Sequence, residues 1–88
     1  MKLISIGFGN YVSADKILTV LSPESAPIKR LISDAKEKGT LIDASFGRST
    51  KTVLFMSSGH IILSALLPAV ISEQIDPGSI AKEDFIND

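Results

Sequence analysis

A short polar stretch at residues 47 to 51, within "DASFGRSTKTVLFM" (Asp43–Met56), offers the chain's clearest candidate chemistry. Its arginine could donate two hydrogen bonds to one phosphate group, and the backbone N–H groups of a glycine-containing loop could donate others. The residues of this stretch that could hold a phosphate are Arg48, Ser49, Thr50 and Lys51. A charged loop is also the ordinary form of a solvated turn, so these residues alone leave both interpretations open.

Positive charge is concentrated in one part of the chain. Residues 1–72 contain eight Lys and Arg and five Asp and Glu, a net charge of +3, whereas residues 73–88 carry a net charge of −4. The overall charge of −1 therefore hides a basic excess that could face a polyanion. Six cations fall within one window of 23 residues: Lys29, Arg30, Lys36, Lys38, Arg48 and Lys51.

Motifs for other chemistry are missing or incomplete. The stretch "FGRSTK" lacks the spacing of a nucleotide phosphate loop, and "GFGNYV" lacks the third glycine of a dinucleotide fingerprint. Gly7 and Gly9 are therefore interpreted as turn glycines, the alternative being a backbone that a partner approaches closely. His60 is the only histidine, and nothing in the sequence brings it together with Ser45 and Asp43 as a catalytic triad. We expect no catalytic site, no metal site, no cofactor and no small-molecule substrate.

One segment has a clear helical period. Its apolar residues recur at i, i+3, i+4 and i+7 and form one stripe: Ile28, Leu31, Ile32 and Ala35. Ser25 can serve as the N-cap, Pro27 is tolerated in the first turn, and Gly39 can end the helix. The pattern predicts a helix that presents Lys29 and Arg30 away from its apolar stripe.

Five other segments have the composition of strands. They are Lys2–Phe8, Lys16–Ser22, Thr40–Phe46, Lys51–Ser57 and His60–Leu66. Ser58 and Gly59 should join the last two as a tight hairpin, and Pro68 should open a short helix over residues 68–75. The pattern predicts a small single α+β domain over residues 1–75, with a mostly antiparallel sheet of about five strands, one main helix and a short C-terminal helix. Residues 76–88 should form a loose acidic tail.

The apolar pattern also predicts self-association. The stretches "TVLFM" and "HIIL" are apolar at consecutive positions, so both faces of those strands need cover. One main helix and one short helix supply too little of it, and a chain of this length buries only about 60 to 65% of its unfolded surface. We therefore expect a homo-oligomer in which other copies cover the remaining face.

The expected location is the cytoplasm. No apolar run reaches the roughly 18 residues of a membrane span, and the start of the chain has none of the features of a signal peptide. The absence of cysteine fits a reducing compartment. We expect no membrane partner.

Residues 6–68 resemble the bacterial extracellular-matrix regulator A (RemA) family. The residues that carry the resemblance are the Gly-Asn and Val-Ser pairs between Gly9 and Ser13, "SPxSAPIKR" at Ser22–Arg30, "DA" at Asp43 and Ala44, "GRxT" at Gly47–Thr50, and "HxILS" at His60–Ser64. The resemblance implies a DNA-binding transcriptional regulator of biofilm-matrix genes, assembled as a ring-shaped homo-oligomer that engages double-stranded DNA around its rim. It also implies a fold similar to that of LytTR-type DNA-binding domains.

The resemblance implies that the DNA contacts lie in the loop that reads "GRSTK". Arg48 matches the family's basic residue, and Lys29 and Arg30 match its "PIKR" motif. Lys51 and Lys16 stand where arginine is usual, and so does Ser49, whose hydroxyl can still bond a phosphate oxygen but brings no charge. Each lost phosphate contact weakens binding, whereas a ring multiplies the contacts that remain.

The resulting hypothesis assigns different roles to these cations. Arg48 and Lys51 would hold phosphates, whereas Lys16, Lys29 and Arg30 would be secondary contacts or parts of the subunit interface. Because phosphate contacts carry no sequence information, specificity would come from DNA shape and bendability or from the periodicity of the ring. The alternative is a structural or protein-interaction ring that does not bind DNA.

Overall fold

The computed structural model describes residues 1–78 and confirms the predicted small α+β domain. Its elements are β1 (Leu3–Gly7), β2 (Asn10–Ser13), the 3-10 helix η1 (Ala14–Lys16), β3 (Ile17–Leu21), α1 (Ala26–Lys38), β4 (Leu41–Asp43), β5 (Thr52–Met56), β6 (Ile61–Ser64) and α2 (Pro68–Ile75). Both predicted helices are present, and so is the predicted hairpin between β5 and β6. Most of the predicted acidic tail, residues 79–88, lies outside the described residues.

The strands form two sheets. β1 and β2 make a two-stranded antiparallel sheet, and the other four lie in the order β3-β5-β6-β4. The pairs β3–β5 and β5–β6 are antiparallel, whereas β4 runs parallel to β6. The prediction of one sheet of about five strands is therefore corrected to six strands in two sheets, with β2 as the strand that the sequence pattern missed.

Helix α1 begins and ends where the sequence predicts. Ser25 stands at the N-cap position, although its side chain makes no capping hydrogen bond, and Pro27 lies in the first turn. Gly39 ends the helix with a φ of 76°, a left-handed conformation that glycine adopts without steric cost.

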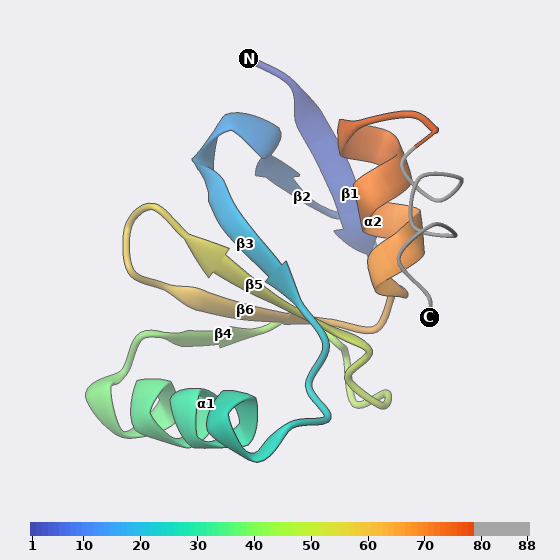
Figure 1. The fold of residues 1–88 in the computed structure, drawn as a ribbon. Coiled ribbons are helices and arrows are strands. Elements are labelled where there is room, and N and C mark those ends of the chain that lie inside the picture. Colours follow the sequence, from blue (N-terminus) through green and yellow to red (C-terminus); the bar gives the residue numbers. More distant parts are fainter. Residues whose placement is uncertain (79–88) are drawn as a thin grey trace.

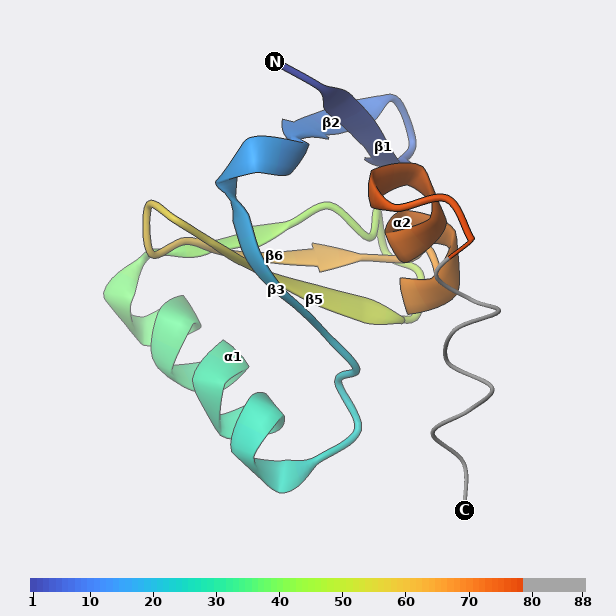
Figure 2. The ribbon, with the colours of Figure 1, turned by 45° about the horizontal axis from the view of Figure 1, so that its top comes forward.

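The four-stranded sheet is covered on both faces by the chain itself. α1 packs on one face, where Ala35 joins Val53, Ile61 and Leu63 in a buried cluster. On the other face β1 and α2 pack against the sheet in a second cluster, whose buried residues are Ile4, Ile6, Leu54, Met56, Ile62 and Ile71. Figures 1 and 2 show this arrangement, with α1 on one side and β1, β2 and α2 together on the other.

This packing leaves less apolar sheet surface for other copies to cover than the sequence predicts. The predicted need for cover was too large, because the β1–β2 hairpin supplies much of it within the chain. The outer strands of the larger sheet nevertheless leave apolar side chains exposed, with Leu18 on β3 64% exposed and Ile42 on β4 47% exposed.

No helix within residues 1–78 is long and apolar enough to cross a membrane.

Candidate nucleic-acid interface

The polar stretch at residues 47–51 lies in the loop between β4 and β5, and its start is fixed by a side chain. Asp43 ends β4, and its carboxylate accepts hydrogen bonds from the backbone N–H of Ser45, at 2.9 Å, and from the Ser45 hydroxyl. The Ser45 carbonyl then accepts the N–H of Arg48 at 3.0 Å, which closes a tight turn. The strand predicted to run to Phe46 stops at Asp43. The Ala44 N–H still donates to the Leu63 carbonyl of β6, but the Ser45 N–H donates to the Asp43 carboxylate instead.

The end of the loop is fixed by the backbone. The Lys51 N–H donates to the Ser64 carbonyl at 2.9 Å, which returns the chain to the sheet beside β6. Between these two anchors the tip of the loop is open to solvent: Gly47, Arg48 and Ser49 are exposed, and Thr50 is half-buried. The residues at the tip are thus accessible to a ligand, while hydrogen bonds hold both ends of the loop in place.

The anchor at Asp43 is electrostatic. The hydrogen bonds from the Ser45 hydroxyl and N–H hold the pKa of the Asp43 carboxyl below its ordinary value of 3.8, against a smaller effect of burial. A carboxyl whose pKa is lower in the folded than in the unfolded state stabilises the fold above its unfolded pKa. That contribution is lost as the pH falls through the folded pKa.

We therefore expect Asp43→Asn to destabilise the protein at pH 7, and to destabilise it less at an acidic pH below the ordinary carboxyl pKa of 3.8, because the stabilising charge is lost as the pH falls through the lowered folded pKa. The loss at pH 7 should be below about 1 kcal/mol, because the side chain is exposed. Urea unfolding at both pH values measures it, with Asp15→Asn as an exposed control. An equal loss at both pH values would show that the carboxylate charge is not what anchors the loop.

Two turns of the same composition meet at this loop. One is the Phe8-Gly9 turn between β1 and β2, and the other is the Phe46-Gly47 turn. Both residues of each pair have positive φ: 56° and 79° in the first turn, 55° and 78° in the second. A positive φ at both central residues is typical of two-residue turns that strongly prefer asparagine, aspartate or glycine at the first position.

Phenylalanine at these positions is strained. Within residues 1–78, Phe8 and Phe46 are the only non-glycine residues with positive φ, and each such conformation costs on the order of 1–3 kcal/mol. The two rings stack on each other, with centroids 5.2 Å apart and planes 29° apart. They remain largely outside the core, since Phe8 is 49% and Phe46 is 77% exposed.

The aromatic pair, Phe8 and Phe46, also contacts the candidate arginine. The Arg48 guanidinium lies 5.7 Å from the centroid of the Phe8 ring, a distance at which a cation is attracted to the ring face. A hollow of about 360 Å³ opens beside them, and its lining residues are Phe8, Arg48, Ser49, Lys51, Ala65 and Leu66. Two cations and a hydroxyl therefore share one exposed concave surface with an aromatic ring.

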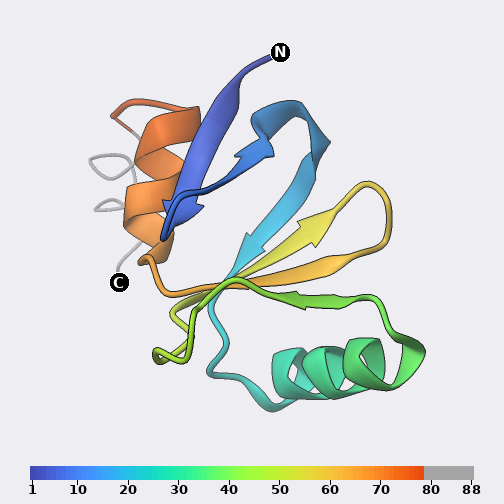
Figure 3. The ribbon, with the colours of Figure 1, turned by 180° about the vertical axis from the view of Figure 1, so that it is seen from behind.

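The remaining predicted cations lie elsewhere. Lys16 precedes β3, whose first residue pairs with Met56, whereas Lys51 precedes Thr52 at the opposite end of β5. Figures 1 and 3 show the β4–β5 loop and the β5–β6 hairpin at opposite ends of the sheet. Lys16 thus faces a different part of the surface from Arg48.

Lys29 and Arg30 occupy the first turns of α1, and both are exposed. The chain enters α1 from the last residue of β3, Leu21, which pairs with Val53 near the loop end of β5. The two residues therefore lie on the helix end nearer to the loop, although neither lines the hollow beside Arg48.

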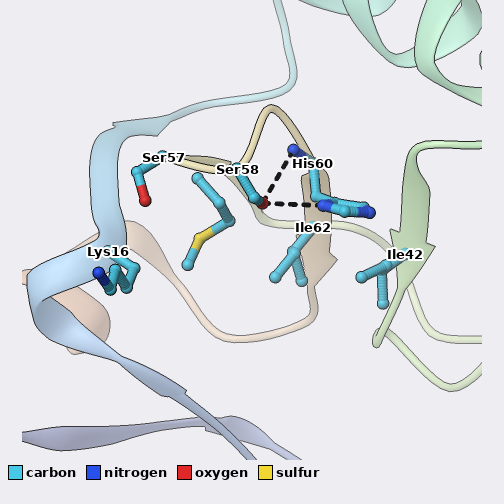
Figure 4. Close-up of a pocket in the computed structure, with 7 residues that line it drawn as sticks. Lys16, Ile42, Ser57, Ser58, His60 and Ile62 are labelled. Atoms are coloured by element: carbon cyan, nitrogen blue, oxygen red, sulfur yellow. Dashed lines mark hydrogen bonds between the residues drawn. The ribbon is translucent and has the colours of Figure 1, made fainter.

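A second hollow, of about 410 Å³, lies at the β5–β6 hairpin (Figure 4). His60 lines it and forms a 2.8 Å hydrogen bond with the Ser58 hydroxyl, while Lys16 approaches from the other side. Asp43 and Ser45 bond to each other at the far end of β6, since Asp43 pairs with Leu63. The fold therefore does not bring His60 together with Asp43 and Ser45.

The residues of the candidate site that the sequence pattern did not reveal are the two phenylalanines. Phe8 and Phe46 are 38 positions apart, and only the folded chain shows that their turns meet. A signal was present in the repeated Phe-Gly dipeptide, in "GFGN" and "SFGR", where turn chemistry would favour a polar residue before glycine.

A family model and full-length relatives both match this chain, and their names all describe regulatory proteins. A family model described as RemA-like, extracellular matrix regulatory protein A-like, matches residues 3–75. Proteins of Dictyoglomus thermophilum and Carboxydothermus hydrogenoformans, both named "Putative regulatory protein", are 52% and 51% identical over 85 residues. These matches cover 97% of this chain and 100% and 98% of those proteins. The Bacillus subtilis protein named "Extracellular matrix regulatory protein A" is 48% identical over 88 residues, which cover 100% of this chain and 94% of that protein.

Proposed function

The chain belongs to the RemA-like family of regulatory proteins, and from this premise we propose that it is a DNA-binding transcriptional regulator of extracellular-matrix genes. Its partner is double-stranded DNA, held through phosphate contacts of the β4–β5 loop. The names of the relatives describe regulation rather than catalysis, which supports a role without enzymatic activity.

The observation that carries the proposal is the shared hollow of Arg48, Ser49 and Lys51. Arg48 supplies a fork of donors, Lys51 a second positive charge, and Ser49 a neutral hydroxyl, which together suit the oxygens of neighbouring phosphates. The anchors at Asp43 and Ser64 fix both ends of the loop before any ligand arrives, which lowers the backbone conformational entropy lost on binding.

Two cations bind a polyanion weakly, so the proposal includes a homo-oligomer. The open edges of β3 and β4 are different surfaces, and each carries an exposed apolar residue, Leu18 and Ile42. A contact between unlike edges is heterologous, and such contacts build a closed ring when the rotation between copies closes. A ring would repeat the Arg48 loop at regular intervals and multiply its contacts through avidity.

The structural alternative makes a different prediction from the same edges. A protein-interaction ring without DNA binding would use Leu18 and Ile42 in the same way but leave the loop solvated. The two functions are separated by salt dependence, because only phosphate contacts release condensed counterions.

We expect wild-type protein to bind a labelled duplex with an affinity that falls steeply with salt. One copy contributes two loop cations, so log K against log salt should be steeper than about −1.8 if several copies engage the DNA. Fluorescence anisotropy across a salt series measures the slope, and light scattering of the same samples measures the assembly mass. An assembly without affinity at low salt would support the structural alternative, and single chains would remove the ring.

A further inference from the structure

The aromatic pair offers a phosphate neither a charge nor a hydrogen-bond donor, yet the fold keeps it beside the proposed phosphate-binding residues. Both rings stand on backbone that disfavours phenylalanine, and neither is buried in the core. Burial in the hydrophobic core therefore does not explain the strain. Strained positive-φ residues cluster where a surface must present a side chain, which makes the pair a candidate contact.

The surroundings of the pair indicate what it contacts. Arg48 lies over the Phe8 ring, and Arg48, Ser49 and Lys51 share the hollow that Phe8 also lines. A polyanion held by these cations would bring its own apolar parts to the rings. In duplex DNA those parts are the base edges and stacked faces, which are reached through the grooves between the phosphates.

The two rings differ in their exposure and in their contacts. Phe8 is the less exposed ring and carries the Arg48 contact, whereas Phe46 is 77% exposed and stands at the tip of the loop that holds Arg48 and Lys51. The Phe8 ring stacks on Phe46, and most of the Phe46 surface nevertheless stays exposed. Phe46 is thus the ring that a docked duplex would meet first.

Resting on the proposed function, we propose that the aromatic pair is a wedge that enters the minor groove of the bound duplex. Phe46 presses between two base pairs and partly unstacks them, and Phe8 supports Phe46 and orients Arg48 toward the adjacent phosphate. Apolar side chains flanked by arginine unstack base steps in this way, and flexible pyrimidine–purine steps yield most readily. The wedge would add an attraction that salt does not screen and a preference for deformable sequences, which phosphate contacts lack.

The test uses a substitution that removes the ring without weakening the turn. Phe46→Asn creates the Asn-Gly pair that turns with two positive φ values prefer, so thermal stability should hold or rise. The probe is a duplex that contains TA steps with 2-aminopurine in place of adenine, whose fluorescence rises on unstacking. Leu3→Ala is the matched control, because it removes an exposed apolar side chain at the opposite end of β1.

We expect wild-type protein and Leu3→Ala to raise the 2-aminopurine fluorescence on binding. Phe46→Asn should bind about tenfold more weakly with no fluorescence rise, and its salt slope should be unchanged because no phosphate contact is lost. Equal affinity of Phe46→Asn and wild type, or no fluorescence rise with wild type, would overturn the wedge and leave phosphate binding intact.

Two other outcomes would overturn the wedge for different reasons. A reduced assembly mass for Phe46→Asn in light scattering would show that the pair is a contact between copies, which overturns the wedge. Absence of any salt-dependent binding by wild-type protein would overturn the proposed function and the wedge with it.

Discussion

Replacing Arg48 with alanine should lower the affinity for duplex DNA by about 100-fold or more while assembly mass and melting temperature stay close to wild type. A hydrogen bond to a charged group contributes roughly 1.5–3 kcal/mol, and the loss is repeated in each copy that touches the DNA. The side chain is exposed, and its contact with Phe8 should contribute only about 0.5–1 kcal/mol to stability. Arg48→Ala should therefore lower the DNA affinity strongly and the free energy of unfolding only slightly.

The salt slope distinguishes a phosphate contact from a general change of charge. Arg48→Ala should make the slope shallower by about 0.9 for each engaged copy. Lys36→Gln removes one positive charge from the exposed surface of α1, so it is the matched control and should leave the slope nearly unchanged. Equal effects of both substitutions would indicate diffuse attraction to the basic surface and would contradict the assignment of the loop as the binding site.

Much of the fold could be predicted because its signals are local. The helical period, Ser25 and Gly39 define α1 within one continuous stretch, and Ser58-Gly59 defines the β5–β6 hairpin in the same way. β2 has no such signal, because it is four residues long and its Tyr11 faces solvent where an alternating strand would bury an apolar side chain. The parallel pairing of β4 with β6 joins segments 20 positions apart, and no local pattern encodes it.

Part of the candidate site could likewise be predicted from local sequence, and part depends on contacts between distant segments. The loop at Arg48 could be found from composition, because glycine, cations and hydroxyls stand together in the chain. The contribution of Phe8 could not, because it depends on two turns meeting in space. The order of importance among the cations was also open, since only pairing register shows that Lys16 and Lys51 lie at opposite ends of β5.

Ser64 joins the segments that carry these two turns, and its removal should have the largest effect on stability of the substitutions considered. Its side chain is fully buried at the end of β6, where its hydroxyl donates to the Ile6 carbonyl at 2.8 Å and accepts the Leu66 N–H at 3.0 Å. Its carbonyl accepts the Lys51 N–H. One residue thus links β6 to the strand before the Phe8 turn and to the end of the Arg48 loop.

Ser64→Ala should destabilise the protein by roughly 2–4 kcal/mol, because the buried Ile6 carbonyl and the part-buried Leu66 N–H each lose a partner, and each such loss costs about 1–3 kcal/mol. That is a large share of the roughly 5–15 kcal/mol that stabilises a domain. Urea unfolding at fixed protein concentration measures the loss as a lower midpoint with an unchanged m-value. Ser57→Ala is the exposed control and should change stability by less than about 0.5 kcal/mol. A similarly small change for Ser64→Ala would mean that the Ile6 carbonyl and the Leu66 N–H find other partners, and that the two turns are held together by the stacked rings rather than by the hydroxyl.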